Sequence, residues 1–352
     1  MKENKLKIKN TVDSISPDIS IILMCLGILI ACPIRIFQML KNIDPVTGFF
    51  DDYTNLTIFI LYGIIGIAGF LIVILTFLSS KIPAAVAPQG RRIPLGLASA
   101  VFSVTLFFDA INNYLSDSQG TATIIQNAES VSNLHHVHAI FAFLACCYFM
   151  ILAFSYIAGR SFHKKLRILS LAPLFWAVIC VLERITIIIS IVRVSELLLE
   201  IIAFVCLMIF FLTFARVVSE VNCKGSMWSV IAFGSVASLV LLVFSIPRFI
   251  ITLTGNADKL VSGYPFIPAT LGCALFAIVF VITTLRCGYK VEDIEQLKKE
   301  EEEEAVQTEE STEDAPADVP VMRDTSGNIR IAKVSSPVNT DAEDNSENAQ
   351  EE

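Results

Sequence analysis

The sequence predicts an all-α protein, a polytopic transmembrane helical bundle of about eight spans that is followed by an acidic tail. Three observations support this class. Apolar runs between Ile19 and Leu285 each approach the roughly 20 residues that a helix needs to cross a bilayer. Hydrophobic residues make up 54% of the chain and charged residues 17%, whereas soluble domains carry about 25% charged residues. Basic residues recur in alternate connecting loops, which is typical of membrane proteins.

The individual spans follow from hydropathy and from the charged or turn-forming residues that interrupt the apolar runs. Pro33 and Pro247 fall inside two of these runs, and membrane helices tolerate such prolines when neighbouring groups satisfy the freed backbone. The predicted spans are 19–40, 55–79, 93–114, 134–158, 167–189, 196–215, 227–252 and 265–286.

The division between the fifth and sixth spans has the weakest sequence signal. Residues 166–216 are too long for one crossing, but no Gly or Pro marks a turn there. We place the turn at Ser190 to Ser195 because Arg193 and Glu196 interrupt the apolar run at this point. Whether residues 166–216 form two full spans is a question for the structure.

The distribution of basic residues orients the chain. Lys and Arg gather before the first span and after the second, fourth, sixth and eighth spans, which marks those loops as cytoplasmic. The opposite loops are poor in them, since 115–133 has no basic residue and 41–54 has Lys41 alone. We therefore predict a multi-pass protein of a cell (inner or plasma) membrane, of bacterial type, with both termini cytoplasmic (N-in/C-in).

Charge also divides the chain into three regions: a basic cytoplasmic N-terminus (1–18), a transmembrane helical domain (19–290) and an acidic, mostly disordered cytoplasmic tail (291–352). The tail holds 20 acidic and 5 basic residues, a net charge of −15, whereas residues 1–290 have a net charge of +7. Such acidity repels nucleic acid and favours a solvated chain, so a cytoplasmic protein is the partner that the tail could bind.

The start of the chain allows a second interpretation. A basic segment followed by an apolar run also describes a signal peptide, and Leu29-Ile30-Ala31-Cys32 resembles the cleavage site of bacterial lipoproteins. Cleavage at Cys32 would leave seven spans. We favour an uncleaved first helix, because such tetrapeptides arise easily in apolar runs.

Small residues in two spans predict close helix packing. Gly63, Gly66 and Gly69 recur at every third position of one span, and Gly96 and Ala100 form a small-xxx-small pair in the next. Small side chains let membrane helices approach closely. These residues concern packing and carry no chemistry.

Ionisable residues within the spans are the main functional clue. The first, third, fifth and seventh spans each carry a charge near the predicted outer end, which suggests a hairpin unit used four times. An ionisable group in a span costs at least about 2.5 kcal/mol, so it usually faces the bundle interior with a partner. The predicted set comprises Arg35, Asp109, Asn112, Asn113, Glu183, Arg184, Arg193, Glu196, Glu200 and Arg248.

Two interpretations of this set compete. Four arginines balance four carboxylates, which favours interhelical ion pairs that hold the bundle together. Alternatively, Arg35, Arg184 and Arg248 converge to bind a small anionic solute or a lipid head group, since the planar guanidinium matches carboxylate and phosphate. Some of these side chains could also simply lie in headgroup water.

The histidines form another cluster at the start of the fourth span. His135 and His138 are three residues apart and could share one helical face. Two histidines with added carboxylates can bind a transition metal, and histidine also titrates near neutral pH. No established metal-binding spacing is present, so an interfacial helix start is the simpler interpretation.

No sequence motif identifies an enzyme or a cofactor. The chain has no Gly-rich phosphate loop, no GxSxG, no HExxH and no CxxC. We therefore predict a bilayer protein without a cofactor that recognises or transports a small anionic solute or lipid. The alternatives are a scaffold or sensor that acts through its tail, and a metal-dependent enzyme that uses His135 and His138.

Overall fold

The computed structural model is all-helical in the part of the chain that it describes. The described residues are 18–45, 50, 56–79, 91–118, 128–159, 167–186, 194–219, 226–260 and 266–287. Internal contacts divide the chain into residues 1–295 and 296–352, and every described residue belongs to the first unit. The predicted acidic tail, Arg193 and the loop residues Asp51 and Asp52 lie outside the described residues.

Eight helices among the described residues are long and apolar enough to cross a membrane, so the chain is a multi-pass membrane protein. Two short 3-10 helices, η2 (Ile168–Leu171) and η3 (Ala257–Lys259), accompany them. The long helices are α2 (Asp18–Lys41), α3 (Leu56–Leu78), α4 (Ile93–Ser118), α5 (Ala128–Ala158), α6 (Ala172–Thr186), α7 (Val194–Val218), α8 (Ser226–Leu253) and α9 (Pro268–Cys287).

The predicted division of residues 166–216 into two spans is confirmed. The 3-10 turn η2 leads directly into the short helix α6, and α7 begins at Val194. The candidate spans here are Ile168–Ile185 and Leu197–Val218. The last two residues of the predicted turn, Val194 and Ser195, and the following Glu196 belong to α7.

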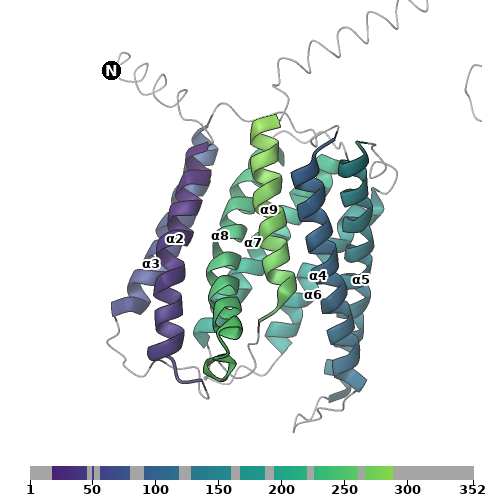
Figure 1. Ribbon diagram of the computed structural model, residues 1–352. Coiled ribbons are helices and arrows are strands. Elements are labelled where there is room, and N and C mark those ends of the chain that lie inside the picture. The colour runs from purple at the N-terminus through teal and green to yellow at the C-terminus, as the bar shows by residue number, and fades with distance from the viewer. Residues whose placement is uncertain are drawn as a thin grey trace, which may run out of the picture. The chain divides into compact units, whose positions relative to one another are not determined.

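Six of the helices form a closed ring (Figure 1). Going round it, α4 contacts α5, α5 contacts α6, α6 contacts α7, α7 contacts α8, α8 contacts α9, and α9 contacts α4. The hairpin of α2 and α3 packs against the ring through α8. As a consequence α8 is the most deeply buried of the eight candidate spans, with 78% of its apolar window buried.

Aromatic side chains fill the middle of the ring. Phe102 of α4 lies 4.5 Å, between ring centroids, from Phe149 of α5, which lies 4.8 Å from Phe276 of α9. Phe214 of α7 and Phe280 of α9 pack edge to face at 5.0 Å. Each such pair adds about 0.5–1.5 kcal/mol beyond its burial. Packing of this kind drives helix association in a bilayer, where lipid tails are as apolar as the side chains.

Close helix contacts occur at some of the predicted small residues. A Cβ added at Gly96 would lie 2.7 Å from Ile157 Cγ1 and 3.1 Å from the Ala153 carbonyl oxygen, so α4 and α5 touch through their backbones there. Of the three glycines in α3, Gly69 faces Val236 of α8. The positions of Gly63 and Gly66 meet no described atom within 4 Å, so close packing there is not confirmed.

Candidate functional site

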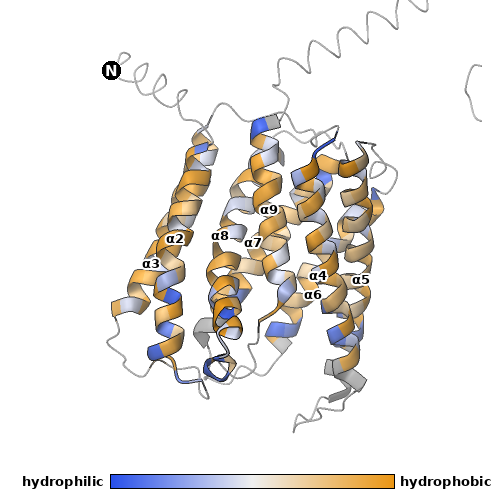
Figure 2. Ribbon diagram, in the orientation of Figure 1, coloured by the Kyte–Doolittle hydropathy of each residue, from blue (hydrophilic) through white to orange (hydrophobic). Residues whose placement is uncertain are grey.

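Hydrophilic positions inside the helices gather in the lower half of the bundle in Figure 2. This is the end at which α2, α4, α6 and α8 finish and their partners begin, and the charge pattern predicts that it faces outward. The intramembrane charges fall here because four consecutive hairpins each carry one near this end. Two clusters of side chains result, which we call the histidine cluster and the arginine cluster.

The histidine cluster is centred on His138 of α5, whose side chain is 6% exposed. Its two ring nitrogens face carboxylates from two other helices. Nε2 lies 2.9 Å from Asp109 Oδ2 on α4, and Nδ1 lies 2.7 Å from Glu183 Oε2 on α6. One imidazole thus joins three consecutive helices of the ring. A buried network of this kind fixes the relative positions of its helices.

Trp176 of α6 completes this cluster. Its indole N–H can donate to Asp109 Oδ2 at 3.0 Å or to His138 Nε2 at 3.1 Å. The indole ring is buried and packs against Phe102 of the aromatic core, with centroids 6.0 Å apart. Trp176 therefore separates the polar cluster from the apolar middle of the ring.

Sequence reasoning missed Trp176 and also Cys180, whose Sγ lies 3.9 Å from His138 Nε2. Both residues are ordinary members of an apolar run, so hydropathy alone does not mark them. A signal was nevertheless present, since Trp176, Cys180 and Glu183 follow the i, i+4, i+7 spacing of one helical face. That face of α6 meets α4 and α5.

Around these residues, His135 and Asn113 extend the histidine cluster. His135 Nδ1 lies 3.3 Å from Glu183 Oε1, and its side chain is 34% exposed. Asn113 donates from Nδ2 to the Asp109 carbonyl oxygen at 2.9 Å and lies 3.4 Å from Asp109 Oδ1. Asn112, also predicted, is exposed on α4. The cluster therefore becomes more exposed from His138 toward His135.

The geometry gives no support to metal binding at His135 and His138. His138 directs its two ring nitrogens toward carboxylates on opposite sides, so its donors and both carboxylates do not converge on one point. Among the described residues, no group of three or more His, Cys, Asp or Glu side chains could hold a metal ion. We therefore do not propose a metal-dependent enzyme that uses His135 and His138.

The first member of the arginine cluster is Arg184, which follows Glu183 in α6. Arg184 points to α7, where its Nη2 lies 3.0 Å from Glu200 Oε1. The Glu200 side chain is 1% exposed, so this is an intramembrane ion pair. Glu183 and Arg184 are adjacent on α6 and hold different helices because consecutive residues point apart. The side chain of Glu196, which shares a face of α7 with Glu200 in the sequence, lies outside the description.

Arg248 of α8 and Arg35 of α2 complete the arginine cluster, and they are 1% and 2% exposed. The Arg248 guanidinium stacks over the Phe244 ring at 3.6 Å from its centroid and also attracts Glu200. Two buried positive charges therefore lie on α2 and α8, two helices that pack against each other.

Arg35 is also tied to the α2–α3 hairpin. Its Nη1 donates to Gln38 Oε1 at 3.0 Å, and Gln38 Nε2 donates to the Thr57 carbonyl oxygen at 2.9 Å. One turn further along, an apolar cluster of Met39, Ile43 and Ile251 joins the ends of α2 and α8. The arginine cluster is thus covered from the lower end of the bundle.

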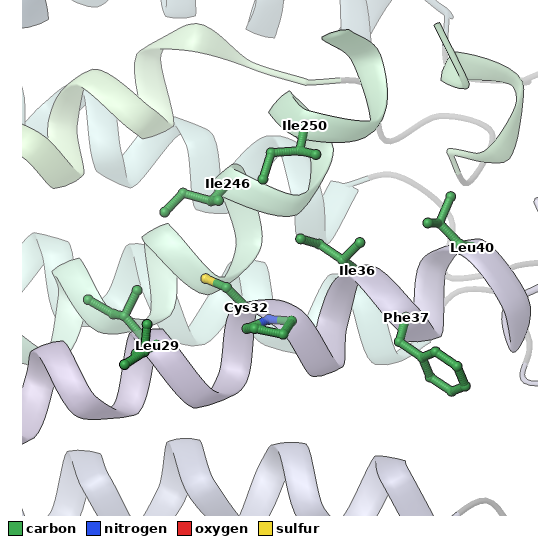
Figure 3. A pocket seen from close by; sticks show the side chains of 9 residues that line it. Leu29, Cys32, Ile36, Phe37, Leu40, Ile246 and Ile250 are labelled. Atoms are coloured by element: carbon green, nitrogen blue, oxygen red, sulfur yellow. The ribbon is translucent and has the colours of Figure 1, made fainter. Parts of the chain in front are cut away.

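A separate apolar groove of about 550 Å³ lies between α2 and α8 (Figure 3). Its lining contains no charged side chain, and Cys32 is its most polar member. Cys32 Sγ on α2 lies 3.8 Å from the Leu242 carbonyl oxygen on α8. Neither Arg35 nor Arg248 lines the groove, so it is a poor site for an anion.

Comparison of the chain with protein-family models, with curated proteins and with solved structures finds no match. The functional argument therefore depends on the two clusters.

Proposed function

We propose that this membrane protein recognises a small anionic solute or an anionic lipid head group at Arg35 and Arg248, and that it moves a bound solute across the bilayer. The observation that carries the proposal is the burial of two guanidiniums, each at most 2% exposed, on α2 and α8, which pack against each other. The charge pattern of the loops supports a cell membrane with the site in the outer half.

The energetics favour a bound negative charge at this position. Each intramembrane arginine costs at least about 2.5 kcal/mol to insert, and Arg35 and Arg248 are both buried. Within the described part of the arginine cluster, the Glu200 carboxylate forms an ion pair with Arg184 and also attracts Arg248. Guanidinium groups bind carboxylate and phosphate in a bidentate manner, so an anion of either type fits.

A purely structural role is the competing function, and the Arg184–Glu200 ion pair favours it. In that case the charges close on one another, with the acidic first loop (Asp51 and Asp52) as a further source of negative charge in the sequence. The two functions differ in one measurable respect. The melting temperature of a purely structural network falls when an arginine is replaced, and it does not rise when anions are added.

Thermal unfolding of the detergent-purified protein distinguishes these functions. The panel contains inorganic phosphate, sulfate, a short-chain carboxylate and phosphatidylglycerol, so that free anions and lipid head groups are separate arms. A ligand at 100 times its Kd stabilises the folded state by about 2.7 kcal/mol. We expect one arm to raise the melting temperature, and Arg248→Gln and Arg35→Gln to abolish that increase.

Arg216→Gln is the matched control, because it removes an exposed guanidinium from α7 and should keep the increase. If no arm raises the melting temperature, or if the increase survives in both cluster variants, the proposal is wrong. Transport is then measured as uptake of the stabilising anion into proteoliposomes. Binding without uptake would restrict the function to recognition.

The acidic tail supports a second prediction, that of a cytoplasmic protein partner. Its residues lie outside the described part of the chain.

A further inference from the structure

We propose that His138 is a proton-binding site, and that the proton it takes up is coupled to anion recognition at Arg35 and Arg248. The coupling rests on the proposed function, whereas the proton site stands on the geometry of the histidine cluster alone.

The cluster provides polar partners for His138 in both of its protonation states. In the neutral state Nε2 accepts the Trp176 N–H at 3.1 Å, and Nδ1 lies 2.7 Å from Glu183 Oε2. In the protonated state Nε2–H donates to Asp109 Oδ2 at 2.9 Å, and the indole N–H turns to the same oxygen at 3.0 Å.

Uptake of a proton by Nε2 therefore changes the acceptor of one indole hydrogen bond, from His138 Nε2 to Asp109 Oδ2. A buried polar group that loses its partner destabilises the folded state. Because the indole N–H keeps an acceptor in both states, His138 can gain a proton without leaving this donor unpaired.

The surroundings of His138 also bear on its protonation. Helix α5 packs along its backbone on α4, α6 and η2, and its Phe149 also contacts α7 and α9. Asp109 faces His138 from α4, Glu183 and Cys180 face it from α6, and His135 lies one turn away on α5. The η2 sequence, Ile168–Leu171, contains no titratable side chain. The imidazole thus lies between two carboxylates, which attract a proton to it.

Contacts between side chains also connect His138 with the surface of the bundle. Side-chain exposure falls from 34% at His135 to 13% at Glu183 and 6% at His138. Glu183 contacts His135 with Oε1 and His138 with Oε2. Glu183 therefore links the partly exposed histidine to the buried imidazole through its two carboxylate oxygens.

Coupling to the arginine cluster follows from the position of Glu183. Glu183 precedes Arg184 on α6, and Arg184 Nη2 lies 3.0 Å from Glu200 Oε1 on α7. A proton on His138 offsets negative charge beside Glu183 and makes the neighbourhood of the arginine cluster more positive. It should therefore strengthen anion binding, and by linkage a bound anion should strengthen proton binding.

The test uses the full chain with Trp228→Phe. The sequence has two tryptophans, so Trp176 becomes the single fluorophore in this background. A protonated imidazole quenches a neighbouring indole, so its emission reports the charge of His138. We expect a single step in emission as the pH is varied, absent in His138→Gln and present in His136→Gln.

His136 is a suitable control because it lies on another face of α5, where its ring is 6.2 Å from the Tyr114 ring. A second variant covers the case in which His138→Gln does not fold. Asp109→Asn removes a carboxylate that accepts from the protonated imidazole, so the step should move to lower pH. A step that is unchanged in His138→Gln, or in Asp109→Asn when the first variant does not fold, overturns the proton site.

The coupling is tested by repeating the titration with inorganic phosphate, or with whichever panel anion raises the melting temperature. We expect the step to move to higher pH, and the apparent anion affinity to fall by up to about tenfold per pH unit above it. A step that is insensitive to a bound anion overturns the coupling. If no anion binds, the proposed function fails, and the emission step still decides the proton site.

Discussion

At the scale of single residues, charge in an apolar run was the informative signal in the sequence. Arg35, Arg184 and Arg248 stand out in their spans because an intramembrane charge is costly, and all three lie in the arginine cluster. Trp176 and Cys180 could not be found in this way, because apolar spans contain such residues routinely. Their role depends on which helix each faces, and a single sequence does not contain that information.

The Arg184–Glu200 ion pair leads to a prediction about stability. Removing one member of a buried pair leaves an uncompensated charge, which typically destabilises a protein by about 3–5 kcal/mol. We expect Glu200→Gln to lower the melting temperature strongly, and Arg184→Gln in the same chain to recover part of the loss. The measurement is a double-mutant cycle by thermal unfolding in detergent. Additive losses would show that the two side chains do not act as a pair.

At the scale of helices, the predicted spans agree closely with the structure where hydropathy and helix coincide. The predicted 19–40 and 227–252 correspond to Asp18–Lys41 and Ser226–Leu253. By contrast α4 and α5 extend to Ser118 and back to Ala128, beyond the apolar runs, because hydropathy does not detect the polar ends of helices. Glycine spacing alone could not distinguish Gly96, which packs, from Gly63, which meets no described neighbour.

The contrast between these glycines can be tested directly. Gly96→Val places atoms where Ile157 and the Ala153 carbonyl already lie, and overpacking of this kind costs about 1–3 kcal/mol. Gly63→Val should change stability far less, since no described atom lies within 4 Å of an added Cβ. Melting temperatures of the two variants check this. Equal losses would mean that α4 and α5 do not approach closely at Gly96.

At the scale of the whole molecule, the sequence predicted the membrane class and the span number but not the arrangement of the helices. Consecutive hairpins pack within themselves, as short connections require. The closure of the ring by α4 and α9 depends on residues far apart in the chain, and nothing in the periodicity of either span indicates it.

Orientation in the membrane is a prediction at this scale. The basic loops should remain in the cytoplasm. A fluorescent reporter that matures only in the cytoplasm should therefore be active at either terminus, and alkaline phosphatase should be active when inserted within 119–127. Phosphatase inserted after Lys164 is the control and should be inactive. The reverse pattern of activities would place the arginine cluster in the cytoplasmic half of the membrane.

The packing of the α2–α3 hairpin on α8 has a mechanical consequence. Arg35 belongs to the hairpin and Arg248 to the ring, so the two buried charges lie on either side of the boundary between two packed bodies. An anion held between them would fasten the hairpin to the ring, and its departure would loosen that boundary. Binding of the anion and packing of the α2–α3 hairpin against the ring would then occur together, so that neither changes without the other.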